Sequence, residues 1–164
     1  MILLIDGRAG SGKTTLAGKF GRILGWPVIH LEDAYPGWGG LAAASDKVAS
    51  SILNPQLSSA ERGFRRWDWY ADSFAEWVET PESPSLIIEG CGALSPANLE
   101  AAASLGDGQV WGVWVETPTH ERFRRAIARD NHFRSHWAMW AQQEDLHIVT
   151  HNPRALAEWV IRNG

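Results

Sequence analysis

The fold of this chain is decided by one stretch, Gly7-Arg8-Ala9-Gly10-Ser11-Gly12-Lys13-Thr14. Its spacing is Gly-x-x-x-x-Gly-Lys-Thr, in which the glycines let successive backbone N–H groups point at bound phosphates. In this motif Lys13 reaches the β- and γ-phosphates, and the Thr14 hydroxyl ligates Mg²⁺. With Thr15 included, residues 7–15 are therefore expected to bind the phosphates of a nucleoside triphosphate.

The flanking residues place this loop between a strand and a helix. Residues 2–6 form a short apolar run that is typical of a buried strand. Apolar residues then recur at helical spacing through residues 15–24, and Gly25 stands where a helix would end. A strand, a glycine-rich loop and a helix are the setting that the motif requires.

Further elements follow along the whole chain of 164 residues, a length typical of a single domain, 1–164. Four more apolar runs predict strands at 28–31, 86–88, 110–115 and 146–150. Helices are predicted between and after them at 41–53, 68–79, 95–106, 117–130, 132–145 and 153–161. Strands that alternate with helices favour an α/β fold with a parallel sheet.

Composition excludes several classes of protein. The net charge of −4 gives no general basic field for nucleic acid. Cys91 is the single cysteine, which excludes an internal disulfide and suits a reducing compartment. No apolar run reaches the roughly 18 residues of a membrane span. Because the loop begins at residue 7 of this sequence, we expect no signal peptide before it. We expect a cytoplasmic protein, with most of its ten tryptophans in packing roles.

Carboxylates stand at the ends of two predicted strands, at the sheet edge where ligands bind in open α/β folds. Asp33 follows the strand at 28–31, and it is a candidate base for deprotonating an alcohol acceptor. Glu32 is the alternative carboxylate, and a solvated turn is the alternative role for Asp33. Glu89 closes the strand at 86–88, where it would join Thr14 in holding Mg²⁺.

Arginines concentrate late in the chain and predict a lid at about residues 122–143. On a helix, Arg122, Arg125 and Arg129 would share one face and could close on a transferred phosphate. Pairing with surface acids such as Glu121 and Asp130 is the alternative. The arginines of this region are Arg122, Arg124, Arg125, Arg129 and Arg134.

A mixed cationic and aromatic segment is the candidate acceptor site. Arg65, Arg66 and Trp67 could stack on and grip a planar or sugar-like acceptor, and Trp38 could line the same pocket. The start of an amphipathic helix is the alternative for this segment. His132 and His136 are four residues apart but lack a third ligand, so we expect no zinc site there.

Together these residues resemble the P-loop small-molecule kinases, most closely the uridine kinase-like branch of nucleoside kinases. That branch has the glycine loop, an Asp-x-[FY] after strand two, a Glu-Gly closing strand three, and an Arg-Arg-x-Ile-x-Arg-Asp in its lid. The matching residues here are 7–14, Asp33-Ala34-Tyr35, Ile87-Ile88-Glu89-Gly90 and 124–130.

The resemblance implies a three-layer P-loop fold whose five parallel strands have the order 2-3-1-4-5. It implies ATP as the phosphate donor and Mg²⁺ as the cofactor. It also implies that Asp33 is the general base, that Arg125 and Arg129 clamp the phosphate, and that Tyr35 belongs to the acceptor site. The loop with Asn152 and Pro153, after the fifth strand, would lie beside the adenine.

Three functions remain open. The first is an ATP-dependent kinase of a small hydroxyl compound, such as a nucleoside or a sugar-like metabolite. The second is a nucleoside monophosphate kinase, for which Arg65 and Arg66 would bind the phosphate of the acceptor. The third is an ATP-binding module that acts through a partner. No Asn-Lys-x-Asp motif marks a guanine site. Tryptophans near 137–140, if exposed, could serve a homodimer interface.

Overall fold

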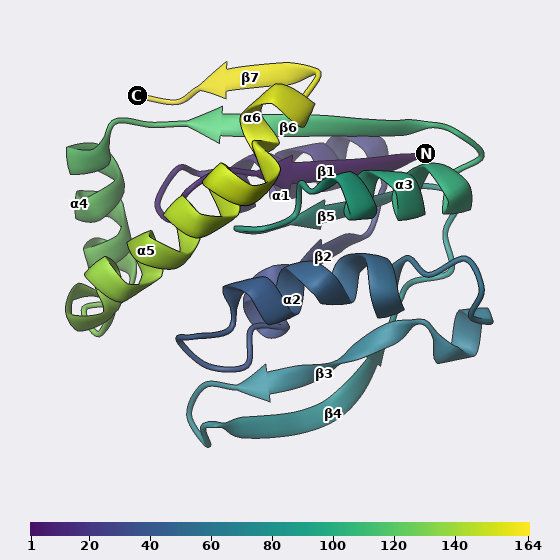
Figure 1. Ribbon diagram of the computed structural model, residues 1–164, viewed down its shortest axis with the longest axis horizontal. Coiled ribbons are helices and arrows are strands. Elements are labelled where there is room, and N and C mark those ends of the chain that lie inside the picture. The colour runs from purple at the N-terminus through teal and green to yellow at the C-terminus, as the bar shows by residue number, and fades with distance from the viewer.

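A five-stranded parallel sheet runs through the computed structural model, which describes residues 1–164 (Figure 1). The strands lie in the order β2-β5-β1-β6-β7, and every neighbouring pair is parallel. Counted among themselves along the chain, these strands have the predicted order 2-3-1-4-5. Their bounds are β1 Ile2–Asp6, β2 Val28–His30, β5 Leu86–Glu89, β6 Val110–Glu116 and β7 Trp159–Arg162.

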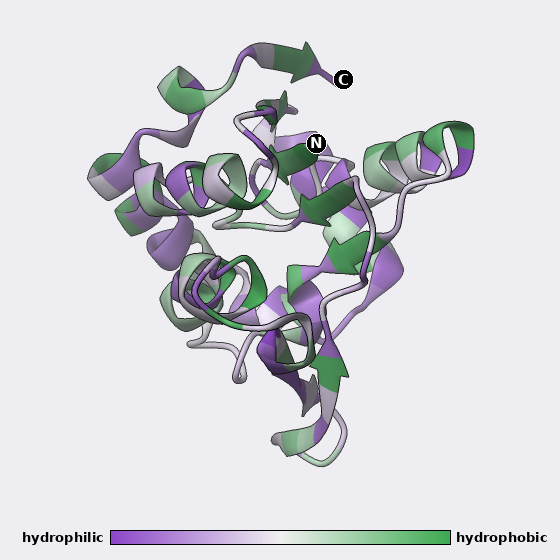
Figure 2. Cartoon of the chain, turned by 90° about the vertical axis from the view of Figure 1, so that its right-hand side faces the viewer, coloured by the Kyte–Doolittle hydropathy of each residue, from purple (hydrophilic) through white to green (hydrophobic).

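Helices cover both faces of this sheet because its strands are apolar on both sides (Figure 2). Alternate residues of β1 point to opposite faces, so Leu3 and Ile5 pack with Ala17 of α1, whereas Ile2 and Leu4 join the larger core on the other side. That other side is covered by α2, α3 and α5 (Figure 1). The helix bounds are α1 Lys13–Leu24, α2 Leu41–Lys47, α3 Pro96–Leu105, α4 Thr119–Arg129, α5 Phe133–His151 and α6 Pro153–Leu156.

Most of the predicted elements are confirmed. The first four strands and the helices α1, α3 and α4 lie where the sequence placed them. The helix predicted at 41–53 is α2 followed by a π-helical turn at Val48–Ile52. Short 3₁₀ turns occur at Leu31–Asp33 and Ser59–Glu61.

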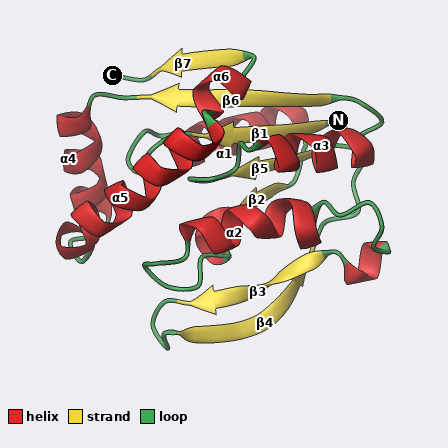
Figure 3. Ribbon diagram, in the orientation of Figure 1, coloured by secondary structure: helices red, strands yellow, loops and turns green.

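The helix predicted at 68–79 is wrong. This part of the chain belongs to an antiparallel hairpin of β3, Gly63–Asp68, and β4, Ser73–Glu79 (Figure 3). Asp72 takes the left-handed conformation in the connecting turn, with φ of 52°. The hairpin is largely exposed on both faces, so the alternation of buried and exposed residues that normally marks a strand is missing.

The last predicted strand and the last predicted helix are also wrong. Residues 146–150 belong to α5, and the segment 153–161 contains only the short α6 before it becomes strand β7. The buried residues of α5 include Trp140, Glu144 and His147, which share one helical face, but two of them are polar. Because the buried face of α5 includes polar residues, the spacing of its hydrophobic residues does not show the period of a helix. No helix combines the length and apolar character needed to cross a membrane.

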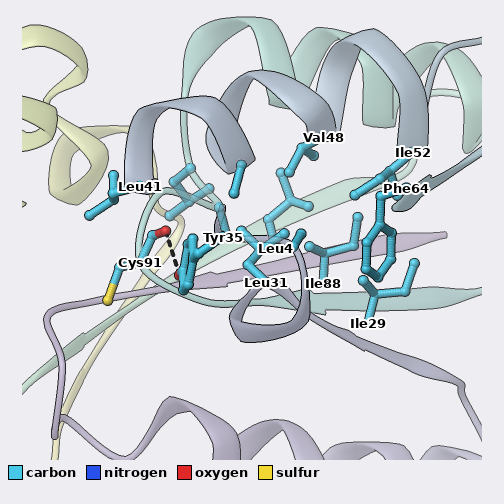
Figure 4. Packing of buried hydrophobic residues seen from close by; sticks show 14 of the residues in the cluster. Leu4, Ile29, Leu31, Tyr35, Leu41, Val48, Ile52, Phe64, Ile88 and Cys91 are labelled. Carbon is cyan, nitrogen blue, oxygen red and sulfur yellow. Dashed lines mark hydrogen bonds between the residues drawn. The ribbon is translucent and has the colours of Figure 1, made fainter. Parts of the chain in front are cut away.

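The larger core lies between the sheet and α2, and it fixes the start of the loop after β2 (Figure 4). Tyr35 is buried among Leu31, Leu41 and Ile88, and its hydroxyl donates a hydrogen bond of 2.8 Å to the backbone oxygen of Cys91. This bond ties the segment after β2 to the segment after β5. Both segments leave the carboxyl edge of the sheet, where the candidate site lies.

Replacing Tyr35 with phenylalanine should lower the free energy of unfolding by about 1–2 kcal/mol, because the buried Cys91 oxygen loses its donor. Denaturant unfolding of the two proteins measures the difference. The control is Tyr70→Phe, which alters a fully exposed phenol and should shift stability by less than about 0.5 kcal/mol. Equal effects of the two substitutions would contradict a structural role for the Tyr35 hydroxyl.

Candidate functional site

The glycine-rich loop 7–14 is held in a conformation that only glycine allows at key positions. Gly10 and Gly12 have φ of 77° and 95°, in the region that side chains disfavour. A Cβ atom at Gly10 would also collide with the backbone of Arg122, and one at Gly7 with the backbone of Val115. The loop therefore packs directly against β6 and α4, which hold its backbone in place.

Lys13 lies at the start of α1 with its side chain buried against the loop. Its Nζ donates to the backbone oxygen of Arg8 at 3.0 Å and lies 3.5 Å from Cys91 Sγ. Burial lowers the pKa of Lys13, but the acidic groups around it, including Glu89, outweigh burial and leave that pKa raised. The ammonium group is therefore positively charged and lies against the backbone of the glycine-rich loop.

Thr14 and Glu89 meet as the sequence predicted. The Thr14 hydroxyl donates to Glu89 Oε1 at 3.0 Å, and His30 Nδ1 lies 2.6 Å from the same oxygen. Burial raises the pKa of Glu89. The hydrogen bond from His30 and the charge of Lys13 lower this pKa by more than burial raises it, so the net shift is downward. The hydrogen bond to Glu89 likewise raises the pKa of His30. The pair consequently presents a carboxylate and a hydroxyl oxygen next to Lys13.

A cavity of about 930 Å³ opens in front of these groups. Of the residues predicted to bind a nucleotide or an acceptor, the following line it: Ala9, Gly10, Gly12, Lys13, Thr14, Thr15, Tyr35, Trp38, Glu89, Arg125 and Arg129. Glu32, the alternative carboxylate, and Trp69, which belongs to the cationic and aromatic segment 65–69, also line it, and the structure adds residues that the sequence did not assign to the site, among them Tyr70, Phe133, His136 and Trp140. They come from the turn after β2, the hairpin tip and α5.

The aromatic side chains that line the cavity, which we call the aromatic wall, pack against one another. Trp38 stacks on His136 with ring centroids 4.0 Å apart and an interplanar angle of 7°. The edge of Trp69 meets Trp38 at 5.1 Å, and Tyr35 meets Trp140 at 4.8 Å. The sequence pattern could have predicted this aromatic wall only if it had predicted the hairpin of β3 and β4, because Trp69 lies in the turn of that hairpin.

Two lid arginines reach the cavity, as predicted, and both have protein partners. Arg129 Nη1 lies 3.5 Å from Glu32 Oε2 across the cavity, and both side chains are about half exposed. Arg125 contacts Glu121 at 3.2 Å and donates to the backbone oxygen of Asn163 at 3.2 Å. Exposed pairs of this kind are weak, so a phosphate could displace them.

Arg122 has a different role from its helical neighbours. Its guanidinium donates to the backbone oxygens of Thr117 and Ala9, at 3.1 and 3.3 Å, and to Thr119 Oγ1 at 3.1 Å. The side chain is buried, and its face lies 5.4 Å from the ring of Trp137. Arg122 therefore braces the glycine-rich loop. Of the two tryptophans near 137–140, Trp140 is buried in the core and Trp137 is partly buried against Phe123 and Phe133.

Asp33 and three residues of the hairpin are not brought to the cavity. Asp33 is exposed, and its neighbour Glu32 lines the cavity instead. Arg66 pairs with Glu76 across the hairpin at 2.6 Å, and Arg65 is exposed. Trp67 packs edge-on against Phe74 at 5.0 Å. Arg65, Arg66 and Trp67 lie on β3, whereas the part of the hairpin that lines the cavity is the turn after β3, with Trp69 and Tyr70.

Asn152 and Pro153 do not follow the fifth strand, because residues 146–150 are helical. Asn152 ends α5 with φ of 47°, and Pro153 begins α6. The segment after the actual fifth strand contains Asn163, whose side-chain amide donates to the backbone oxygen of Ser11 at 2.8 Å. Asn163 also lines a second cavity of about 510 Å³, together with Arg8, Thr117, Arg122 and Arg162.

Comparison with solved structures finds the same α/β fold in several kinases. A possible uridine kinase from Bacillus stearothermophilus matches 98% of this chain and 88% of its own, with a TM-score of 0.61 and 19% identity. A shikimate kinase from Bacteroides thetaiotaomicron matches 99% of this chain and 86% of its own, with a TM-score of 0.53 and 17% identity. A gluconokinase from Sinorhizobium meliloti 1021 matches 98% and 79%, with a TM-score of 0.52 and 15% identity.

No protein-family model and no curated protein sequence matches the chain. The neighbours are kinases of different small molecules, at identities where the likeness shows the fold alone. The identity of the substrate must therefore be argued from the residues of the cavity.

The His30–Glu89 contact predicts a pH-dependent stability. Because folding raises the pKa of His30 above its ordinary value of 6.5, the contribution is full below that pH and is lost as the pH rises through the folded-state pKa. The lowered pKa of Glu89 removes the contribution again in acid, below its ordinary value of 4.5. Denaturant unfolding of the natural chain and of His30→Gln, at pH 5 to 9, should show a stability difference that shrinks toward alkaline pH.

Proposed function

We propose that this chain is an ATP-dependent phosphotransferase that moves the γ-phosphate to the hydroxyl of a small, uncharged acceptor, such as a nucleoside or a sugar-like metabolite. One observation carries the proposal. A single cavity is lined by Lys13 and Thr14 and also by the aromatic wall and the carboxylate of Glu32. These are the parts that phosphoryl transfer to an alcohol needs.

The triphosphate would lie in the glycine-rich loop, with Lys13 at its β- and γ-phosphates. Thr14 and Glu89 supply hydroxyl and carboxylate oxygens, which are the ligands that Mg²⁺ prefers, and Mg²⁺ takes its remaining ligands from phosphates and water. The ion would neutralise phosphate charge there. Arg125 and Arg129 would leave their carboxylate partners, Glu121 and Glu32, to bind the transferred group.

The adenine would lie at the second cavity, between the segment 117–119 and Asn163. This replaces the expectation that Asn152 and Pro153 contact the base. The second cavity adjoins the glycine-rich loop, since Thr117 Oγ1 and the Asn163 side chain both donate to the backbone oxygen of Ser11, at 3.1 and 2.8 Å.

An uncharged acceptor is favoured by the positions of the cations. A nucleoside monophosphate kinase would need arginines free to bind the phosphate of its acceptor. Arg65 and Arg66, which supported that alternative, lie on β3 outside the cavity. The cavity is instead lined by Trp38, Trp69 and Tyr70, whose ring faces suit a planar base or a sugar.

Glu32 is the better placed candidate for the base that accepts the proton of the hydroxyl. It lines the cavity, and its pairing with Arg129 would end when the arginine moves to the phosphate. Asp33, the base implied by the family pattern, is adjacent in sequence and remains the alternative. The two carboxylates can be separated by experiment.

Replacing Lys13 with alanine should reduce ATP turnover by at least about 10²-fold, because the charge that stabilises the β- and γ-phosphates is lost. Titration with a labelled ATP analogue and a coupled ADP assay measure the binding and the turnover. Lys19→Ala is the matched control on the same helix, since Lys19 is exposed. Unchanged turnover in the Lys13 variant would remove the basis of the proposal.

Glu32→Gln and Asp33→Asn should behave differently once an acceptor is known. We expect Glu32→Gln to lower the rate of transfer by about 10²-fold or more while ATP affinity is kept, and Asp33→Asn to have a small effect. Single-turnover transfer measures both. The reverse order would assign the base to Asp33, and no effect from either would argue against an alcohol acceptor.

The decisive experiment is ADP release from Mg²⁺·ATP in the presence of nucleosides, nucleoside monophosphates and small hydroxyl metabolites, one at a time. Stimulation by a neutral hydroxyl compound would support the proposal and give the acceptor class. Stimulation by monophosphates alone would favour a nucleoside monophosphate kinase. ATP binding without any stimulation would favour an ATPase module that acts through a partner.

A further inference from the structure

One face of α5 contacts both ends of the candidate site. The face consists of Trp140, Gln143, Glu144 and His147, which are spaced to lie together on one side of a helix. We refer to these four residues as the α5 face. Three of them are buried, and Gln143 is partly buried. The helix crosses in front of the sheet toward α4 (Figure 1).

At the nucleotide end, the α5 face holds the start of the glycine-rich loop. Glu144 Oε1 accepts a hydrogen bond of 2.6 Å from the backbone N–H of Ala9, and its other oxygen lies 3.5 Å from Arg8 Nη1. His147 Nε2 lies 3.2 Å from Asp6 Oδ2, and Asp6 in turn accepts from the N–H of Gly7. The carboxylate of Glu144 is buried, so its placement depends on these partners.

At the acceptor end, the same face holds the segment that carries Trp38. Gln143 Nε2 donates to the backbone oxygen of Trp38 at 2.7 Å, and the N–H of Leu41 donates to Gln143 Oε1 at 3.3 Å. Trp140 packs edge-on against Tyr35 at 4.8 Å and Trp38 at 6.4 Å. Neighbouring residues of one helix thus restrain both the phosphate end and the aromatic wall.

We propose that the α5 face couples the two ends of the cavity, so that nucleotide bound to the glycine-rich loop orders the acceptor segment 37–41, and an acceptor against Trp38 strengthens nucleotide binding. Gln143 carries the link to the acceptor segment, and Glu144 is a positioning residue for the loop. Coupling through ordering is reciprocal by thermodynamic linkage. The inference rests on the proposed function in requiring that a nucleotide binds the loop.

Amide hydrogen exchange with Mg²⁺·ADP as the probe tests this coupling without a known acceptor. In the natural chain, ADP should slow exchange both in residues 7–14 and in residues 37–41, by at least about 5-fold in the second segment. In Gln143→Ala, residues 7–14 should still be protected, while the effect on 37–41 falls below about 2-fold. Gln142→Ala is the control, since Gln142 is the same residue type, adjacent and exposed.

The outcomes separate this inference from the proposed function. Protection of 7–14 without protection of 37–41 in the natural chain would overturn the coupling and leave nucleotide binding intact. Protection of 37–41 that persists in Gln143→Ala would also overturn it. No protection of 7–14 would overturn the proposed function, and the coupling with it.

Two conservative variants test the role of Glu144. Glu144→Gln keeps an oxygen at the distance of the Ala9 N–H, so its affinity for Mg²⁺·ADP should stay within about 3-fold of the natural chain. Glu144→Asp keeps the charge but is one methylene too short, so its affinity should fall by about 10-fold. Calorimetric titration of the folded proteins measures both. Equal affinities in the two variants, or a weaker glutamine variant, would overturn the positioning role.

Discussion

The arrangement of the site depends on the buried carboxylate of Asp6 at the end of β1. One oxygen accepts hydrogen bonds from the N–H groups of Gly7 and Gly92, at 2.6 and 3.1 Å. The other accepts from the N–H of Leu94 at 2.9 Å and lies 3.2 Å from His147. A single side chain therefore joins the glycine-rich loop, the segment after β5 and the helix α5, and burial makes each of these bonds costly to lose.

A second constraint is the balance of charge around Lys13. A buried ammonium group is stable only if opposite charges and hydrogen-bond acceptors surround it. Glu89, Asp6 and Glu144 provide them, and all three are buried. The carboxylates keep Lys13 charged before any phosphate arrives, so the site is organised in advance for an anion. Cys91 lies in the same cluster, but burial raises its pKa to about 12, which makes it a packing residue.

The sequence predicted the parts of the fold that depend on local chemistry. Gly7–Thr14, the first four strands and the meeting of Thr14 with Glu89 follow from residue types at fixed spacing. It failed where tertiary contacts override the local pattern. The run at 146–150 looks like a strand, yet it continues a helix whose buried residues include Glu144 and His147. Polar residues that are buried because they bind the loop cannot be recognised from hydrophobicity.

The same failure explains which residues of the candidate site were missed. Tyr70 was not predicted at the site, and it lines the cavity together with Trp69 because both lie at the turn of the hairpin, whereas Arg65 and Arg66 lie on β3 outside the cavity. The difference matters for function, because the two cations expected to contact the acceptor do not line the cavity, whereas two aromatic rings do. The cations that remain in the cavity are at its phosphate end and on α4. Charge is thus placed where a triphosphate would lie, and the acceptor end is left to ring faces and one carboxylate, which favours a neutral alcohol over a phosphorylated acceptor.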